Sequence, residues 1–322
     1  MPRLHYLLIG GALFAAAGLA RAQLHYPSKP VRMIVPYAPG GTTDIVARLI
    51  GPKLADSLGQ PIVVDNRPGG NTVIGTSALA KAQPDGYTIM IMVIAHVIVP
   101  NLISTPYHAI SDFSPVAAIS ASEQVLVVHP AVAANTLREL ISLAKQRPGQ
   151  LNYGSAGSGG LTHLASELFN VMAAVKTQHI PYKGAGPAIT DLIGGQIQMY
   201  FATPVSVMQH IKNARIKALA ITGNTRSPAL AHVPTFAEAG MPAFEVKNWQ
   251  GLLAPAGTSK AIVDKLSGEI GLILRQPDVI ARLVGYGLDP LILTPERFGA
   301  LMRADMEKFA HVIKTAHVKL EN

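Results

Sequence analysis

The stretch VPYAPGGTTDIVARLI, residues 35–50, decides the fold of this chain of 322 residues. The apolar, β-branched segment at residues 30–37 predicts a buried strand. A Pro-Gly-Gly corner follows it, and the Thr-Thr-Asp that comes next is typical of a helix start. One apolar face then recurs every fourth position, at Val46, Ile50, Leu54 and Leu58. The stretch therefore predicts a strand, a sharp turn and a helix with one buried face.

The same order repeats immediately downstream. Residues 61–65 (PIVVD) predict a second strand, and residues 66–86 contain another Pro-Gly-Gly loop with a helix from about Thr72. Residues 87–93 (YTIMIMV) predict a third strand. Alternation of strands and helices at this spacing predicts a parallel α/β unit with right-handed crossovers.

A second α/β unit follows, with predicted strands that begin near residues 122, 151, 177, 196 and 215. Residues 244–258 then return as an extended segment, and two helical stretches close the chain. We expect the chain to cross between the units near Glu123 and near Trp249. The predicted domain 1 is therefore discontinuous, with residues 23–122 and 249–322, and domain 2 comprises residues 123–248. We expect Trp249, the one tryptophan, to pack at the crossing rather than line a cleft.

Composition limits the classes of function. A hydrophobic fraction of 49% with 14% charged residues is typical of a globular protein. The net charge is +8, but the Lys and Arg residues are scattered singly, which argues against a nucleic-acid partner. The absence of cysteine excludes a thiol nucleophile and a Cys-ligated metal.

The first 22 residues are typical of an export signal. Arg3 lies near the start, an apolar segment covers residues 6–19, and Ala20-Arg21-Ala22 matches a cleavage site. The apolar segment is short for a membrane span, which needs about 20 residues. An N-terminal anchor is the alternative. We expect cleavage after Ala22 and a periplasmic mature protein.

Glycine-bearing loops leave strands in both units. The corner at residues 36–44 follows the first strand, where open α/β sheets bind ligands, and its helix start favours an anion. The segment YGSAGSGGLTH, residues 153–163, repeats this arrangement in the second unit, and residues 180–188 form a third loop with Tyr182 and Lys183. A structural turn before a helix is the alternative for either of the first two loops alone. Two such loops on opposite units predict an anion site in a shared cleft.

Patterns for catalysis are weak. Ser155 or Ser158 with His163 would make an exported serine hydrolase, but Ala156 stands where a G-x-S-x-G motif needs its serine. His163 falls in the first turn of a predicted helix, where we expect it to cap or pack. The sequence has no P-loop, no dinucleotide fingerprint and no H-E-x-x-H pair. Binding without chemistry, metal or cofactor is the favoured interpretation.

These segments together resemble the solute-binding receptors of tripartite tricarboxylate transporters, the Bug or TctC family. The resemblance rests on residues 26–49, 58–88, 112–120, 151–169, 180–199 and 233–258, and covers nearly the whole chain after the signal. It implies a type II periplasmic binding protein with the two-lobed venus-flytrap fold. Each lobe is expected to be a mostly parallel sheet flanked by helices. It also implies binding of a small carboxylate at Tyr37, Ala38, Gly41, Thr42, Asp44, Ser155, Gly157, Ser158 and Thr162, with Tyr182 nearby.

Two departures from the family bear on the ligand, at two further residues that we expect to contact it, Ala95 and Ala202. Ala202 stands where the family usually has an aspartate, and the segment around Ala95 is more apolar than expected. Both changes favour a dicarboxylate or an aromatic acid without an amino group. The expected partners are the membrane components of a tripartite tricarboxylate transporter, with a sensor kinase as the alternative. We expect the receptor itself to be a monomer.

Overall fold

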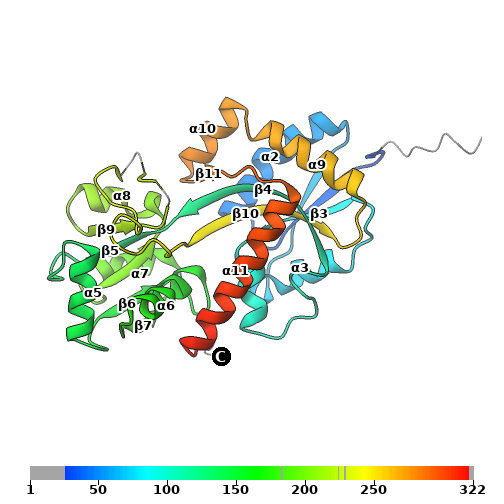
Figure 1. Cartoon of the computed structure of the whole chain (residues 1–322). Coiled ribbons are helices and arrows are strands. Elements are labelled where there is room, and N and C mark those ends of the chain that lie inside the picture. The colour runs from blue at the N-terminus through cyan, green and yellow to red at the C-terminus, as the bar shows by residue number, and fades with distance from the viewer. Residues whose placement is uncertain (1–25, 183, 224, 228–229, 319–322) are drawn as a thin grey trace, which may run out of the picture.

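The computed structural model describes residues 26–318 except 183, 224 and 228–229. The chain forms two α/β lobes joined by two long strands (Figure 1). Residues 1–22, the predicted signal peptide, lie outside the described residues. Among the described residues, no helix combines the length and apolar character needed to cross a membrane.

Lobe 1 is built on a six-stranded sheet with the order β11-β4-β10-β3-β1-β2. Its strands are β1 (Val31–Val35), β2 (Ile62–Asn66), β3 (Thr88–Val93), β4 (Phe113–Glu123), β10 (Lys247–Pro255) and β11 (Asp289–Pro290). Its helices are α2 (Thr42–Leu58), α3 (Val73–Ala80), α4 (Ala95–Ile98), α9 (Lys260–Ile273), α10 (Pro277–Gly285) and α11 (Pro295–Thr315), with short 3-10 turns η2 (Gly70–Thr72) and η3 (Val99–Asn101).

Lobe 2 is built on a five-stranded sheet with the order β7-β6-β8-β5-β9. Its strands are β5 (Val125–Val128), β6 (Asn152–Ser155), β7 (Gln178–Pro181), β8 (Met199–Ala202) and β9 (Lys217–Ile221). Its helices are α5 (Leu137–Gln146), α6 (Leu161–Ala173), α7 (Ala185–Ile193) and α8 (Pro204–Lys212).

The two-lobed α/β class predicted from the sequence is confirmed, but the sheets are mixed rather than mostly parallel. β1 pairs in parallel with β2 and β3, whereas β10 runs antiparallel to both β3 and β4. In lobe 2, β6 is parallel to β7 and β8, and β5 is antiparallel to β8 and β9. The reason is the route of the chain, which leaves lobe 1 along β4 and returns along β10.

Where the chain passes from lobe 1 to lobe 2, it breaks a segment that the sequence pattern predicts as one strand beginning near residue 122. β4 ends at Glu123 and β5 begins at Val125, so the chain changes sheet at Gln124. The Gln124 N–H donates to Thr222 Oγ1 at 2.9 Å, which secures the change of sheet. The exact division into domains at residues 122 and 248 stays a prediction.

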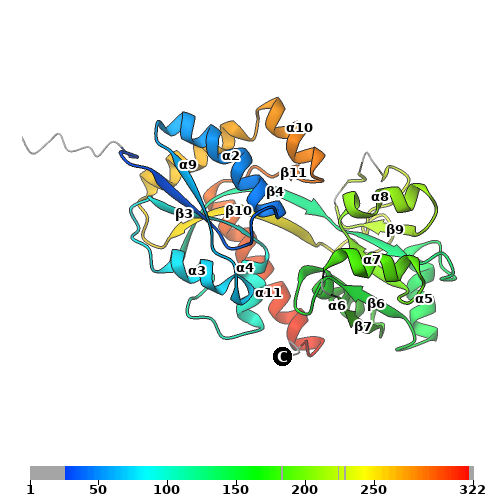
Figure 2. The ribbon, with the colours of Figure 1, turned by 180° about the vertical axis from the view of Figure 1, so that it is seen from behind.

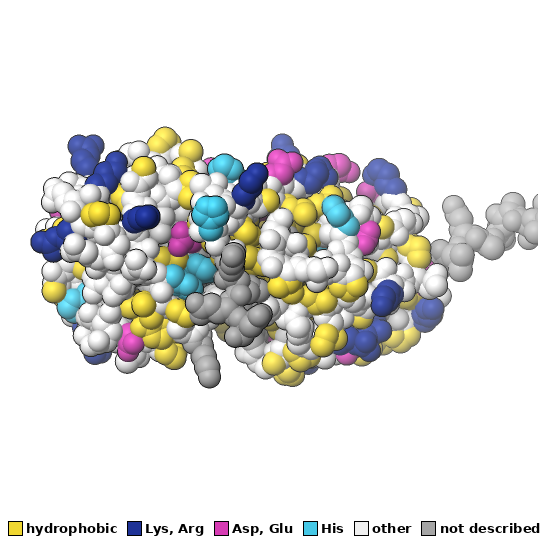
Figure 3. Space-filling view, turned by 90° about the horizontal axis from the view of Figure 1, so that it is seen from below, with side chains coloured by type: hydrophobic (Ala, Val, Ile, Leu, Met, Phe, Trp, Pro, Cys, Tyr) yellow, Lys and Arg dark blue, Asp and Glu magenta, His cyan; other side chains and the backbone are white. Residues whose placement is uncertain are grey.

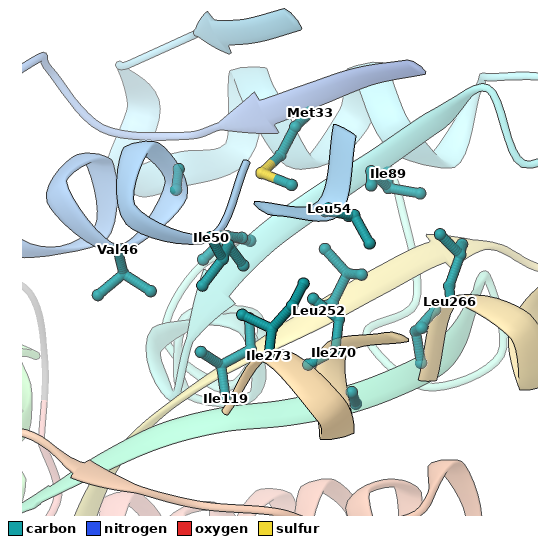
Figure 4. Close-up of a cluster of buried hydrophobic side chains, with 14 of the residues drawn as sticks. Met33, Val46, Ile50, Leu54, Ile89, Ile119, Leu252, Leu266, Ile270 and Ile273 are labelled. Carbon is teal, nitrogen blue, oxygen red and sulfur yellow. The ribbon is translucent and has the colours of Figure 1, made fainter. Parts of the chain in front are cut away.

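The apolar face of α2 fills the core of lobe 1, as its periodicity predicts. Val46, Ile50 and Leu54 are fully buried against strands and against α9 (Figure 4). Packing of this face, rather than intrinsic helix propensity, holds α2 in place and thereby positions the loop that precedes it.

Helix α11 packs on both lobes. Figure 1 shows it crossing in front of β4 and β10 and ending beside α6. Phe298 near its start packs against Trp249, and Val312 near its end belongs to the core of lobe 2. Trp249 is fully buried, and its indole Nε1–H donates to Asp305 Oδ2 at 2.8 Å. The expectation that Trp249 packs instead of lining a cleft is confirmed.

Candidate functional site

A pocket of about 410 Å³ lies between the lobes. Lobe 1 supplies the loop before α3 and the wall formed by α4 and η3, and lobe 2 supplies the loop before α6. Figure 2 shows where the helices α3, α4 and α6 lie on the two lobes. We call it the interlobe pocket. It is lined by Tyr37, Asn71, Thr72, Ala95, Val99, Leu102, Ala156, Gly157, Ser158, Gly159, Gly160, Leu161 and Thr162.

Lobe 2 contributes the Gly/Ser loop, residues 154–160, whose amides are mostly used inside the loop. The Ala156 N–H donates to Thr162 Oγ1 and the Gly159 N–H donates to His163 Nδ1, both at 2.9 Å. The Gly157 N–H donates to Ser155 Oγ at 3.3 Å. These three amides are therefore not free for a ligand. The bonds instead hold the loop in one conformation.

The first turn of α6 carries the available donors. The Leu161 and Thr162 amides donate to no acceptor in the described part of the chain, and both residues line the interlobe pocket. The first amides of a helix have no intrahelical acceptor, and the helix dipole favours an anion beside them. This turn can therefore bind a carboxylate.

Two histidines support the Gly/Ser loop from behind. The rings of His163 and His179 stack with centroids 3.8 Å apart. Burial, with a contribution from His179, lowers the pKa of His163 to about 3, and burial lowers the pKa of His179 to about 4. Both rings are therefore neutral at physiological pH. They can brace the loop, but they bring no positive charge to the pocket.

The geometry argues against Ser155 with His163, one of the two pairs that the serine-hydrolase alternative offers. Ser155 is fully buried and its Oγ lies 2.6 Å from Nε2 of His179, not of His163. His163 is occupied with the Gly159 amide, so the expectation that it caps or packs is confirmed. Among the residues that the structure describes, no cluster of three or more His, Cys, Asp or Glu side chains could hold a metal ion.

Asp44 shapes the Pro-Gly-Gly corner, residues 38–41. Its carboxylate is buried and accepts hydrogen bonds from the Gly40 N–H at 2.9 Å, from Arg48 Nε at 3.0 Å and from Asn66 Nδ2 at 2.9 Å. The hydrogen bond from Arg48, aided by those from Gly40 and Asn66, lowers the pKa of Asp44 to about 2. Asp44 is thus an internal brace, and the Gly40 amide is not free for a ligand.

The structure brings together only part of the predicted site. Five of the predicted residues line the interlobe pocket: Tyr37, Ala95, Gly157, Ser158 and Thr162. The others lie outside its lining: Ala38, Gly41, Thr42, Asp44, Ser155, Tyr182 and Ala202. Whether these residues contact a ligand stays a prediction.

The reasons differ among the residues outside the lining. Ala38 and Gly41 are exposed on the corner before α2, and Thr42 is exposed as the first residue of α2. The Tyr182 hydroxyl donates to Asp191 Oδ2 at 2.8 Å, which ties the ring to α7. Ala202 is buried in the core of lobe 2, because its position on β8 faces the packed side of the sheet.

Sequence reasoning missed two polar residues of the lining, Asn71 and Thr72. They belong to the second Pro-Gly-Gly loop, residues 68–72, which follows β2 as the first corner follows β1. The signal was the repeat itself, since equivalent strand ends in a parallel sheet lie at the same edge. Val99 and Leu102 also line the pocket and, with Ala95, contribute its apolar wall on lobe 1.

Among the residues that the structure describes, the lining of the interlobe pocket contains no charged side chain. Figure 3 shows Lys and Arg side chains spread over both lobes rather than gathered on the face in view. The described lining therefore offers neutral donors, a helix start and apolar contact, which is typical of a small-molecule site.

The fold and the pocket define a two-lobed solute-binding protein. The model of the tripartite tricarboxylate transporter family receptor, TctC, matches residues 46–318, and the chain belongs to this family. The family comprises solute-binding receptors, not enzymes.

Several relatives are similar over nearly the whole chain. The protein BugT of Bordetella pertussis is 36% identical over 323 residues, covering 98% of each chain. An R. palustris protein solved with adipate is 33% identical, with a TM-score of 0.74 over 92% of this chain and 100% of that one. MatC from Rhodopseudomonas palustris, solved with bound malate, is 31% identical, with a TM-score of 0.72 over 89% and 100%.

Proposed function

We propose that this protein is an exported, monomeric receptor that captures a small organic carboxylate in the interlobe pocket and delivers it to the membrane components of a tripartite tricarboxylate transporter. The observation that carries the proposal is the pocket itself. Its lining includes the free amides of Leu161 and Thr162 on lobe 2 and apolar residues on lobe 1. Two family members of known structure were solved with adipate and with malate.

The favoured ligand is a dicarboxylate or an aromatic acid that lacks an amino group. A helix N-terminus contributes about 0.3–2 kcal/mol to binding an anion, and charge-assisted hydrogen bonds add to this. Within the described part of the chain, the lining includes no Asp or Glu that could pair with an ammonium group. Ala95, Val99 and Leu102 instead offer apolar contact to a carbon chain or ring.

The test is isothermal titration calorimetry of the mature protein with adipate, malate, benzoate and glutamate. We expect at least one of the first three acids to bind, and glutamate to bind at least about tenfold more weakly. Tighter binding of glutamate than of the plain acids contradicts the ligand class. Absence of binding by all four contradicts the carboxylate receptor.

A substitution in the pocket wall locates the site. Ala95→Asp places a carboxylate on the lobe 1 wall, and we expect it to abolish binding through like-charge repulsion and desolvation. Ala261→Asp, on an exposed face of α9, is the matched control and should bind as the wild type does. Equal binding by both variants places the ligand elsewhere. Co-purification with a sensor kinase instead of transporter subunits contradicts the delivery step.

A further inference from the structure

The second Pro-Gly-Gly loop has an unusual backbone where it meets the interlobe pocket. Four consecutive residues have positive φ: Gly69 at 116°, Gly70 at 54°, Asn71 at 50° and Thr72 at 78°. Glycine adopts such angles freely, whereas a β-branched residue does so only rarely, because its side chain crowds the backbone. Thr72 is therefore held in a conformation that its own side chain disfavours.

The surroundings impose this conformation. Thr76 Oγ1 donates to the Thr72 carbonyl at 2.9 Å, and the Val73 N–H donates to the Gly70 carbonyl. Gly75 brings the first turn of α3 against the exit of β1, where an added Cβ would lie 2.8 Å from Pro36 Cβ. The loop is thus fixed by contacts on both sides, and the strain at Thr72 cannot relax.

The Thr72 hydroxyl has no structural task among the described residues. A threonine that precedes a helix usually accepts a hydrogen bond from the first turn, but Thr72 at the N-cap of α3 makes no such bond. Its residue is 5% exposed, and Oγ1 has no hydrogen-bond partner in the described part of the chain. Thr72 also lines the interlobe pocket. A buried hydroxyl without a partner is costly unless something else satisfies it.

We propose that Thr72 is a specificity-determining residue whose hydroxyl donates a hydrogen bond to a ligand oxygen in the interlobe pocket, and that the strained backbone is retained to place it there. This inference rests on the proposed function and deepens it. It assigns lobe 1 a hydrogen-bonding subsite opposite the α6 amides of Leu161 and Thr162. A ligand with oxygen atoms at both ends, such as a dicarboxylate, satisfies both subsites at once.

Binding measurements test the contact. With adipate and malate as probes, we expect Thr72→Val, which keeps the shape and removes the hydroxyl, to bind about tenfold more weakly. Thr72→Ser, which keeps the hydroxyl, should bind within about threefold of the wild type. Ser77→Ala is the matched control, because Ser77 Oγ on the same helix is also buried without a partner but does not line the pocket. Its affinity should be unchanged.

Thermal unfolding without ligand tests the strain. At an ordinary helical position alanine is more stable than glycine, whereas at a left-handed position the order reverses. We expect Thr72→Gly to melt about 2–4 °C above Thr72→Ala. Thr76→Gly should melt below Thr76→Ala, since Thr76 lies within α3.

The outcomes separate this inference from the proposed function. If Thr72→Val binds with wild-type affinity, the proposed hydrogen bond from Thr72 to the ligand is wrong, but the proposed function is not affected. If Thr72→Ala is more stable than Thr72→Gly, the proposed backbone strain at Thr72 is wrong. Failure of the wild type to bind any of adipate, malate, benzoate and glutamate contradicts the proposed function, and the Thr72 contact with it.

Discussion

Replacing Asp44 with Asn tests how the Pro-Gly-Gly corner is held. The carboxylate accepts from the Gly40 amide, from Arg48 and from Asn66. Asn66 also donates to the carbonyl of Tyr37, a residue of the pocket lining, at 3.1 Å. Asp44 thus connects the corner, the end of β2 and one wall of the interlobe pocket.

The expected cost follows from the burial and the partners of this group. Asp44 is 2% exposed. An asparagine there keeps one acceptor oxygen but turns an NH₂ group toward donors, so at least one charged hydrogen bond is lost. Hydrogen bonds to charged groups contribute about 1.5–3 kcal/mol. We expect Asp44→Asn to lower the free energy of unfolding by about 2–3 kcal/mol at pH 7.

The pH dependence has a definite sign. The hydrogen bond from Arg48 is the largest cause that lowers the pKa of Asp44 from 3.8 to about 2. A carboxyl group with a lowered pKa stabilises the fold fully above its unfolded value and loses that contribution as the pH falls toward the folded value. The difference between wild type and Asp44→Asn should therefore be constant above about pH 5 and shrink between pH 4 and about 2.

Urea unfolding followed by circular dichroism from pH 3 to pH 8 measures both quantities. Arg48→Ala is the control, because the Arg48 side chain is 55% exposed and its removal leaves the bonds from Gly40 and Asn66. It should destabilise the protein less than Asp44→Asn does. An Asp44→Asn variant within about 0.5 kcal/mol of the wild type at pH 7 refutes the reasoning, as does a difference that persists unchanged at pH 3.

Three further predictions concern the core and the loop support. Trp249→Phe removes the indole N–H that donates to buried Asp305 and should lower the free energy of unfolding, measured with urea, by about 1–3 kcal/mol. An unchanged free energy of unfolding would show that Asp305 finds another donor. Gly251→Ala places a Cβ against the ring of Phe298 and should lower the free energy of unfolding by about 1–3 kcal/mol. Gly268→Ala on α9, where an added Cβ has no atom within 4 Å, should raise the free energy of unfolding by about 1 kcal/mol. Equal changes in the two variants would contradict the close contact between Gly251 and Phe298. Burial lowers the pKa of His163 to about 3 and that of His179 to about 4, so the unfolded chain takes up protons first as the pH falls below 6.5. Stability should therefore decrease from about pH 6.5 to about pH 4, and less steeply in His163→Asn; parallel pH profiles for the two proteins would refute this.

Much of the architecture was predictable because local patterns carry it. The four-residue period of α2 predicts the face that fills the core, and Val46, Ile50 and Leu54 are fully buried there. Glycine loops at strand ends predict the region of the site, and five of the twelve predicted residues line the interlobe pocket. The failures fall inside these loops. A glycine-rich segment shows where a ligand can approach, but not which of its amides its own side chains already occupy.

The sequence by itself determined the α/β alternation, the burial of the α2 face and the position of the glycine-bearing turns, because each depends on neighbours within a few residues. Only the tertiary structure decided that Ser155 pairs with His179 and that β4 and β10 are antiparallel. It alone placed Asn71 and Thr72 in the pocket wall. These features depend on groups far apart in the chain, and their distances are set by how the two lobes pack on the crossing strands and on α11.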